Sequence, residues 1–326
     1  MRGWLPVVLL VVACAPVRVP LDGVYRVGRF EGDGSFSWSA SRLSVKFTGS
    51  GKVRAAFRQI ERPATAEGPG QPVRLQVELD GTSRQLYAED DGSLVFEQVV
   101  PPGAHRLTVV RQSEAMIGAA RLEELELPPG AKIEPWQPQP LIEFIGDSMT
   151  TGFGVEGQDP CPFSTKTQAV TAAYPWLVGL SLKADVRIVA WSGKGVVRNW
   201  GDRPGPTVPD LWKPAEPAPD LVFVALGAND FWSGDAGPNF KAGYAVFLSK
   251  VRAAYPNAQL VQLALEPKSA VLDDTIVLDP VPEGYGFGCV GHPSSQTQRF
   301  IADQVIERVC RVVKGGAFCG AVAAAP

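Results

Sequence analysis

Four short motifs in the second half of the chain carry the residue types that hydrolyse an ester. They are Gly146-Asp147-Ser148, Ser192-Gly193, Gly227-Ala228-Asn229 and His292-Pro293. A serine hydroxyl attacks a carbonyl carbon efficiently only when a neighbouring base with a pKa near neutrality takes its proton. Ser148 is the candidate nucleophile, and His292 is the only histidine in this half of the chain. The sequence therefore predicts that Ser148 and His292 meet, although they lie far apart along it.

The same chemistry needs hydrogen-bond donors for the negative charge that develops on the carbonyl oxygen. We expect the backbone N–H groups of Ser148 and Gly193 and the side-chain amide of Asn229 to supply them. Removal of one such donor typically raises the activation free energy by roughly 3 kcal/mol. The predicted reaction class is acyl transfer to water.

Each motif taken alone has a simpler interpretation. Asp147 or Ser148 would cap a helix, Asn229 fits an Asx turn, and a lone histidine is more often structural than catalytic. Gly193-Lys194 lacks the upstream glycine and the following Ser or Thr of a phosphate-binding loop, so nucleotide binding is not expected. A single histidine without a His-Cys cluster argues against a catalytic zinc. We expect neither a metal nor another cofactor.

The elements that must position these motifs form an alternating pattern. Compact apolar runs predict strands buried on both faces at 141–145, 186–190, 221–226 and 260–265. Helices are predicted at 175–183, 240–254 and 297–313. This alternation predicts an α/β domain over residues 141–326 with a parallel sheet between helices, in which ligand sites lie at the carboxyl ends of the strands. Three motifs directly follow strands, so the fold would gather them at one edge.

The first half of the chain has a different pattern. Short runs with period-two alternation, bounded by Gly, Pro and Asp, predict antiparallel strands at 43–47, 73–79 and 105–110. Several such strands predict a jelly-roll-like β-sandwich domain over residues 21–134. The segment 128–140 holds five prolines and is the expected linker. A length of 326 residues agrees with two domains.

Charge and the N-terminus restrict partners and location. Lys and Arg number 31 and Asp and Glu 34, for a net charge of −3, so nucleic acid is not an expected partner.

Residues 1–14 carry an apolar run after Arg2 that is too short to span a membrane and predicts a signal peptide. Val11-Val12-Ala13-Cys14 resembles a bacterial lipobox, which implies a lipid anchor at Cys14 in the periplasm or at the cell surface. The alternative is a plain secretory signal, and both export the chain.

Export gives the cysteines a structural interpretation, because thiols outside the cytosol tend to oxidise in pairs. Without Cys14, four cysteines remain. Cys310 and Cys319 lie close together in the sequence, and elimination then pairs Cys161 with Cys289. Other pairings, or four free thiols, stay open.

The four motifs together resemble those of the SGNH, or GDSL-type, hydrolase superfamily, over residues 141–314. The stretches 142–148 and 189–199, and Gly288-Cys289 before His292-Pro293, are similar to carbohydrate esterase family 2. A β-sandwich in front of the hydrolase domain fits the same family. The resemblance implies a deacetylase of plant polysaccharides such as acetylated xylan or glucomannan, acting through an acyl-enzyme.

One position departs from the wider superfamily. Many members place an Asp three residues before the histidine to orient it, and this chain has Cys289 there. The resembled family works with a Ser-His dyad in which a main-chain carbonyl holds the imidazole. We therefore expect a carbonyl near Val290 or Gly291 to orient His292. Asp279 or Glu283 is the alternative.

Loop aromatic residues are the candidate sugar-binding surface. They are Trp200, Trp212, Phe231 and Trp232. Trp232 follows the expected Asn229 donor and is the first candidate to stack on a sugar ring, although a loop tryptophan can equally cover the core. Rival hypotheses are an O-acetyl esterase of peptidoglycan or exopolysaccharide, a lipase-like esterase and a non-catalytic glycan-binding protein. The chain has no long apolar lid segment that would favour the lipase.

Overall fold

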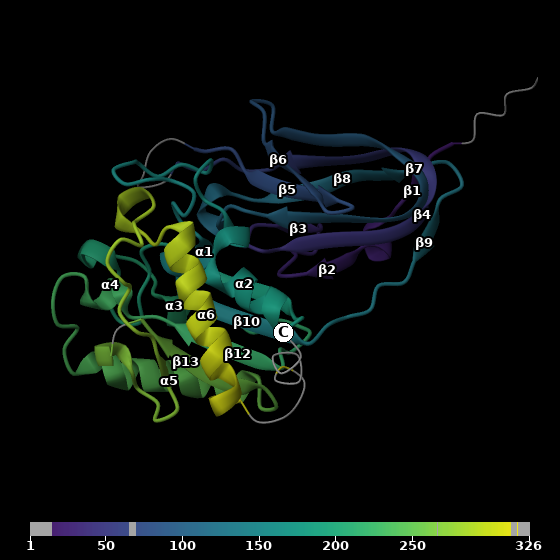
Figure 1. Cartoon of the computed structure of the whole chain (residues 1–326). Coiled ribbons are helices and arrows are strands. Elements are labelled where there is room, and N and C mark those ends of the chain that lie inside the picture. Colours follow the sequence, from purple (N-terminus) through teal and green to yellow (C-terminus); the bar gives the residue numbers. More distant parts are fainter. Residues whose placement is uncertain (1–14, 65–69, 266, 314–317, 319–326) are drawn as a thin grey trace, which may run out of the picture.

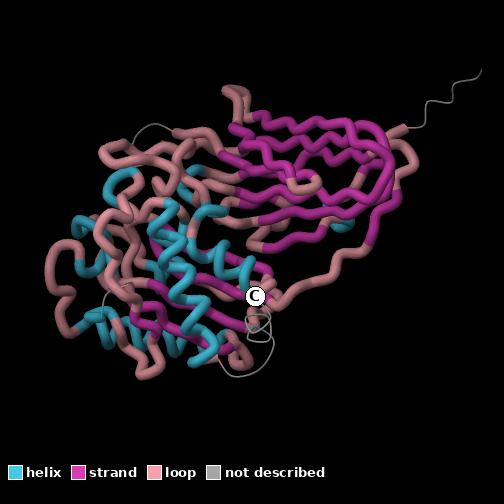
Figure 2. Tube along the Cα trace, in the orientation of Figure 1, coloured by secondary structure: helices cyan, strands magenta, loops and turns pink. Residues whose placement is uncertain are grey.

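The computed structural model describes residues 15–64, 70–265, 267–313 and 318. An antiparallel β-rich half is followed by an α/β half, as the sequence predicts (Figures 1 and 2). Cys14 and the expected signal peptide lie outside the described residues, and so does Cys319, the expected partner of Cys310. No helix among the described residues is long and apolar enough to cross a membrane.

The N-terminal half forms one hydrogen-bonded antiparallel network among the described residues. Its strands are β1 (Val17–Arg18), β2 (Tyr25–Val27), β3 (Ser35–Phe36), β4 (Arg42–Gln59), β5 (Arg74–Leu79), β6 (Thr82–Tyr87), β7 (Ser93–Arg111), β8 (Ala120–Leu127) and β9 (Lys132–Glu134). The first strand lies ahead of the expected start at 21 and pairs with β8. The last strand lies inside the expected linker and pairs with β4.

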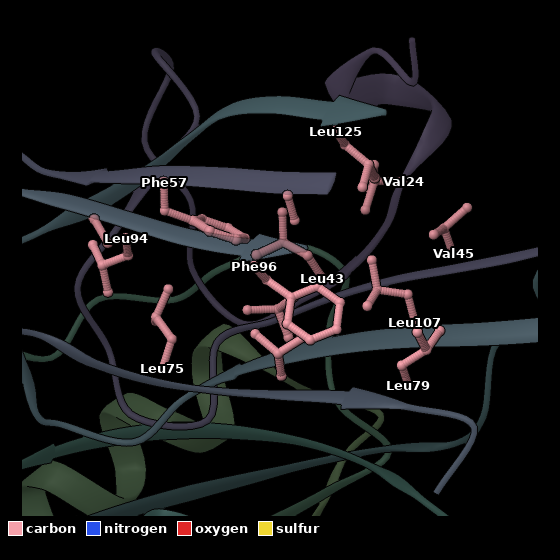
Figure 3. Packing of buried hydrophobic residues seen from close by; sticks show 14 of the residues in the cluster. Val24, Leu43, Val45, Phe57, Leu75, Leu79, Leu94, Phe96, Leu107 and Leu125 are labelled. Atoms are coloured by element: carbon pink, nitrogen blue, oxygen red, sulfur yellow. The ribbon is translucent and has the colours of Figure 1, made fainter. Parts of the chain in front are cut away.

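The long strands β4 and β7 connect the two layers of this half. The register of β4 shifts between Gly49 and Gly51, opposite Gly103 of β7. Before the shift β4 pairs with β2 and β9, and after it β4 pairs with β8. A strand that bends at such a bulge passes from one layer to the other, and apolar side chains from both layers fill the space between them (Figure 3).

The C-terminal half holds a parallel sheet in the order β11-β10-β12-β13-β14. These strands are β10 (Leu141–Asp147), β11 (Asp185–Trp191), β12 (Leu221–Ala225), β13 (Gln259–Ala264) and β14 (Ile276–Val277). The helices are α1 (Ser148–Thr151), α2 (Tyr174–Ser181), α3 (Val208–Leu211), α4 (Ala228–Phe231), α5 (Asn239–Ala254) and α6 (Ser295–Val312). The predicted strands and long helices are confirmed, within one or two residues at most ends.

Helices cover both faces of this sheet. Within β10, Ile142 and Phe144 share a buried cluster with α2 and α6, whereas Ile145 shares the opposite cluster with α5. Successive side chains of a strand point to opposite faces, so a strand covered on both sides must be apolar at nearly every position. This explains why the strands of this half have compact apolar runs, and the β-rich half has alternation.

The two halves share their cores. Phe153 and Phe163 of the α/β half belong to the buried cluster of the β-sandwich. In return, Ala40 and Val110 of the sandwich belong to the cluster beneath α2 and α6. The sandwich therefore supports loops of the α/β half that lie near its strand ends.

Candidate active site

Ser148 lies at a tight corner between β10 and α1. Asp147 ends the strand and caps the helix, because its Oδ1 accepts the Met149 N–H at 3.1 Å. Gly146 allows this corner, since a Cβ there would lie 2.0 Å from Thr150 Oγ1. The Ser148 side chain is thereby fixed at the carboxyl edge of the sheet, with only 8% of the residue exposed.

His292 precedes α6, whose N-cap is Ser294. Its Nε2 lies 2.9 Å from Ser148 Oγ, and its Nδ1 lies 3.0 Å from the Val290 carbonyl oxygen. A carbonyl can only accept, so Nδ1 carries the proton and Nε2 presents a lone pair to the serine hydroxyl. The structure thus brings Ser148 and His292 into contact in the tautomer that a general base requires.

The surroundings of His292 keep the imidazole neutral. Burial lowers its pKa, while the hydrogen bond to the Val290 carbonyl and the Cys289 carbonyl act in the opposite direction. Phe153 packs against the ring with centroids 4.3 Å apart. An imidazole with a lowered pKa is unprotonated at neutral pH and free to accept a proton.

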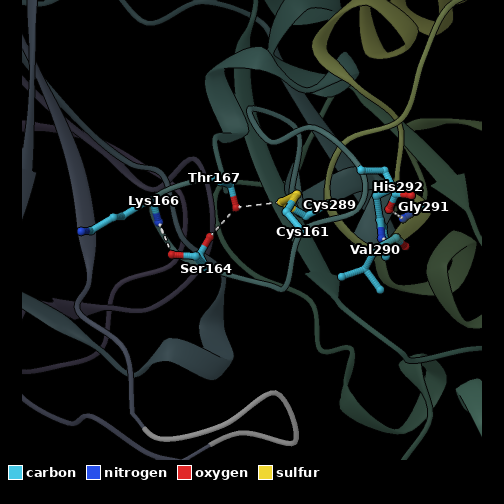
Figure 4. Close-up of a disulfide and its surroundings, with 9 residues drawn as sticks. Cys161, Ser164, Lys166, Thr167, Cys289, Val290, Gly291 and His292 are labelled. Atoms are coloured by element: carbon cyan, nitrogen blue, oxygen red, sulfur yellow. Dashed lines mark hydrogen bonds between the residues drawn. A yellow bond between two sulfur atoms is a disulfide. The ribbon is translucent and has the colours of Figure 1, made fainter.

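The carbonyl that holds His292 belongs to a strained turn. Val290 adopts φ 56° and ψ 39°, a left-handed conformation that a β-branched residue rarely takes. The predicted Cys161–Cys289 disulfide is present and ties this turn, η6 (Cys289–Gly291), to the loop after α1 (Figure 4). Asp279 pairs with Arg308 instead of His292, so a main-chain carbonyl and not a carboxylate faces Nδ1.

Two of the three expected oxyanion donors lie in the segments that follow the strands beside β10. Gly193 follows β11 with φ 76°, and its N–H donates to no other described residue. Asn229 lies in α4 after β12 and donates through Nδ2 to the Lys194 carbonyl at 2.9 Å and to Asp147 Oδ2 at 3.3 Å. The Asn229 amide thus joins the Gly146-Asp147-Ser148 corner to the loop that follows Gly193.

Asp230 has a role that the sequence reasoning missed. Its Oδ1 accepts the backbone N–H groups of Val196, Val197 and Arg198 at 3.1, 2.8 and 3.0 Å. Burial raises the pKa of Asp230, and these three hydrogen bonds act against that rise. The carboxylate holds the loop after Gly193 in place. Its position directly after Asn229 was visible in the sequence, but its partners were not.

Asp147 is a buried carboxyl at the centre of the site. Its pKa is raised to about 7, chiefly by burial; the charges of Asp230 and Glu114 act in the same direction, and the hydrogen bond from the Met149 N–H opposes the rise. Asp147 makes its bonds to the Met149 amide and to Asn229, so it organises the corner of Ser148.

The loop aromatic residues separate into two groups. Trp200, in η4 (Trp200–Asp202), and Trp232 have ring centroids 6.0 Å apart, and Trp232 is 67% exposed. Phe231 packs on Phe240 with centroids 4.8 Å apart and is only partly exposed. Trp212 is a core residue rather than a surface one, because it is buried and its Nε1 donates to the buried Glu143 at 3.0 Å.

No group of three His, Cys, Asp or Glu side chains suited to a metal ion occurs among the described residues.

Residues 144–317, more than half of the chain, match the family model of the GDSL-like lipase/acylhydrolase family. The chain belongs to this family. Its GDSL motif is the Gly146-Asp147-Ser148-Met149 corner, with Met in place of Leu.

Two curated relatives of this family member carry names of carbohydrate-active enzymes. Cellulase/esterase CelE of Acetivibrio thermocellus is 28% identical over 242 residues, which are 69% of this chain and 28% of that protein. An acetylxylan esterase / glucomannan deacetylase of Cellvibrio japonicus is 30% identical over 151 residues, 40% of this chain and 41% of the relative. The chain therefore aligns with less than half of the length of each.

A solved structure has the same fold across both halves of this GDSL-like protein. A family two carbohydrate esterase from Clostridium thermocellum, in complex with cellohexaose, has a TM-score of 0.76 and 22% identity. The similarity covers 89% of this chain and 100% of that chain. The β-rich domain in front of the α/β domain is therefore part of a shared fold.

Proposed function

We propose that this protein is a serine esterase that removes O-acetyl groups from carbohydrate. The observation that carries the proposal is the pair of contacts of His292, with Ser148 Oγ at 2.9 Å and the Val290 carbonyl at 3.0 Å. A nucleophile, a neutral base and a group that fixes its tautomer are the parts that acyl transfer requires. Membership of an acylhydrolase family supports the same reaction class.

In the proposed reaction, Ser148 Oγ attacks the acetyl carbonyl carbon while its proton moves to His292 Nε2. The tetrahedral intermediate places negative charge on the former carbonyl oxygen, which the amides of Ser148, Gly193 and Asn229 would bind. The bond to the sugar oxygen then breaks, and His292 returns the proton to the leaving hydroxyl. Water attacks the acetyl-enzyme with His292 again as base, which releases acetate and restores Ser148.

The substrate class rests on the relatives and on the aromatic surface. One relative is named cellulase/esterase and the other acetylxylan esterase / glucomannan deacetylase, and the solved structure is a complex with cellohexaose. The exposed Trp232, with Trp200 and Phe231 beside it, offers flat apolar faces on the loop that follows Asn229 and near Gly193. We therefore propose an acetylated polysaccharide, such as xylan or glucomannan, as substrate. Acetylated peptidoglycan or exopolysaccharide is the alternative.

We further propose that the chain is exported and held at the cell envelope through a lipid on Cys14. The sequence before Cys14 supports this proposal. The Cys161–Cys289 disulfide supports export, since disulfides persist in oxidising compartments. Mass spectrometry of the envelope fraction would detect the acylated Cys14, and an unmodified chain in the cytosol would refute the location.

The test of the function is acetate release from an aryl acetate and from acetylated xylan and glucomannan. We expect the wild type to release acetate and Ser148→Ala to release none above background. A fully active Ser148→Ala variant would refute the nucleophile. A wild type that binds glycan but releases no acetate would favour the non-catalytic glycan-binding protein.

A further inference from the structure

Glu114 is a buried carboxylate of the β-sandwich whose partners lie in the other domain. It follows β7 in sequence and precedes the short helix η2 (Ala115–Ile117). The residue has no exposed surface. Burial of a carboxylate is costly unless hydrogen bonds compensate it, so its partners show what it is fixed to.

Both oxygens of Glu114 contact Ser192, the residue immediately before Gly193. Oε2 accepts the Ser192 N–H at 3.0 Å, and Oε1 accepts the Ser192 hydroxyl at 2.7 Å. Oε1 also accepts Gln168 Nε2 at 3.0 Å. The carboxylate therefore fixes both the backbone and the side chain of Ser192.

The sandwich supports Glu114 from behind. Arg111, also fully buried, donates through Nη2 to the Glu114 carbonyl at 3.1 Å and to the Gly118 carbonyl at 2.6 Å. Burial lowers the pKa of Arg111 to about 9, and the charge of Glu114 opposes that shift. Trp38 of the sandwich packs edge-on against Trp191, with centroids 4.2 Å apart. The sandwich thus holds the two residues that lead into Gly193.

The far side of the same loop is held by the α/β domain. Asp230 binds the amides of residues 196–198, and the Trp200 N–H donates to the Gly193 carbonyl at 2.9 Å. Between these anchors, the Gly193 N–H donates to no described residue. An oxyanion donor must point in a fixed direction before substrate arrives, and fixed neighbours on both sides meet that requirement.

We propose that Glu114 is a positioning residue of the active site, which holds Ser192 so that the Gly193 N–H faces the substrate oxygen above Ser148. The inference rests on the proposed function, because it assigns Gly193 to the oxyanion. It makes the β-sandwich a part of the catalytic machinery: its Glu114 completes the site that the α/β domain carries.

The first measurement compares kcat and KM of Glu114→Ala and Glu114→Gln on an aryl acetate. We expect Glu114→Ala to lower kcat by about 10- to 100-fold with little change in KM, because a misplaced donor weakens only the transition state. Glu114→Gln keeps the shape and one acceptor oxygen but presents an NH2 group in place of the other oxygen, so we expect a smaller loss of kcat. This graded recovery distinguishes hydrogen bonding to Ser192 from space filling.

The second measurement reports on Gly193 itself. Labelling serine carbonyls with ¹³C and glycine amides with ¹⁵N selects the amides of Ser-Gly pairs, among them Ser192-Gly193. We expect the Gly193 resonance to shift or broaden in both Glu114 variants, and more in Glu114→Ala. This readout requires no catalysis by the protein.

Tyr25→Phe is the matched control. The Tyr25 hydroxyl donates to Asp185 across the same domain boundary, but Asp185 begins β11 whereas Ser192 follows its end. Loss of that hydrogen bond weakens the boundary without touching Ser192, so kcat and the Gly193 resonance should stay at the wild-type values.

The outcomes separate this inference from the proposed function. Folded Glu114→Ala with an unshifted Gly193 resonance and wild-type kcat overturns the inference. If Glu114→Ala fails to fold, Glu114→Gln decides, and an unshifted Gly193 resonance in that variant overturns it as well. If the wild type releases no acetate, the proposed function fails, while a shifted Gly193 resonance would still support the positioning by Glu114.

Discussion

The two histidines of the described chain lie in surroundings that favour opposite protonation states. In the sandwich, His105 Nδ1 is 2.7 Å from the Asp80 carboxylate and Nε2 is 2.8 Å from the Pro101 carbonyl. In the α/β half, His292 has a carbonyl at Nδ1 and a hydroxyl at Nε2. Protein surrounds most of each imidazole ring, and the two rings differ in their hydrogen-bond partners.

The pKa shifts follow from these partners. For His105, burial lowers the pKa, but the hydrogen bonds to Asp80 and Pro101 outweigh it and the pKa is raised. For His292, burial prevails and the pKa is lowered. Two acceptors require both nitrogens to carry protons, which stabilises a cation, whereas one acceptor and one hydroxyl leave a nitrogen free to work as a base. The partners, rather than the residue type, separate a structural histidine from a candidate catalytic one.

The largest expected effect on kcat is the loss of the His292 imidazole, compared with the loss of the His105 imidazole. We expect His292→Ala to lower kcat at least about 10⁴-fold while the protein stays folded, because Ser148 loses its base. His105→Gln should leave kcat within about twofold of the wild type, since it does not contact the site. Steady-state kinetics on an aryl acetate check both. Equal losses in the two variants would end the distinction between the histidines.

The next effect concerns the turn that presents the Val290 carbonyl. The double variant Cys161→Ala/Cys289→Ala should lower the free energy of unfolding by about 2 to 5 kcal/mol, because the disulfide closes a long loop. Molecules that stay folded should keep most of their kcat. Denaturant unfolding and kinetics at low temperature measure the two quantities. A variant of native stability that loses kcat completely would instead assign the disulfide to the chemistry.

The pH profile tests the state of His292 directly. Only the neutral imidazole accepts the serine proton, so kcat/KM should fall by about tenfold per pH unit below the His292 pKa. Since that pKa is lowered from 6.5, the acidic limb should lie below pH 6.5. A limb clearly above pH 6.5 would contradict the lowered pKa. A profile with no acidic limb would contradict the role of base.

The smallest expected effect is on the stability of the sandwich. The pKa of His105 is higher in the folded state than the ordinary 6.5, so its contribution is complete below that value and is lost as pH rises through the folded pKa. As the pH rises from 6.5 through the folded pKa of His105, the melting temperature of the wild type should therefore decline by a few degrees more than that of His105→Gln. If the melting temperatures of the two proteins changed equally with pH over this range, the Asp80 contact would contribute nothing to stability.

The sequence was sufficient for the features that depend on local pattern. Alternation predicted the antiparallel half, and apolar runs predicted β10 to β13, because burial on one or two faces sets the period of apolar residues. Since parallel strands end at one edge, the motifs after three of them had to lie close together. The short list of candidates for nucleophile and base followed from residue chemistry.

The tertiary structure decided the partners of those residues. The Val290 carbonyl, and not Asp279, faces His292; Asp230 binds three backbone amides; and Trp212 is buried. These features depend on contacts between segments far apart in the chain. The contact of Glu114 with Ser192 joins two domains. Hydrogen bonds of this kind leave no periodic signal in the sequence, because their geometry exists only after the hydrophobic cores have packed and fixed the loops.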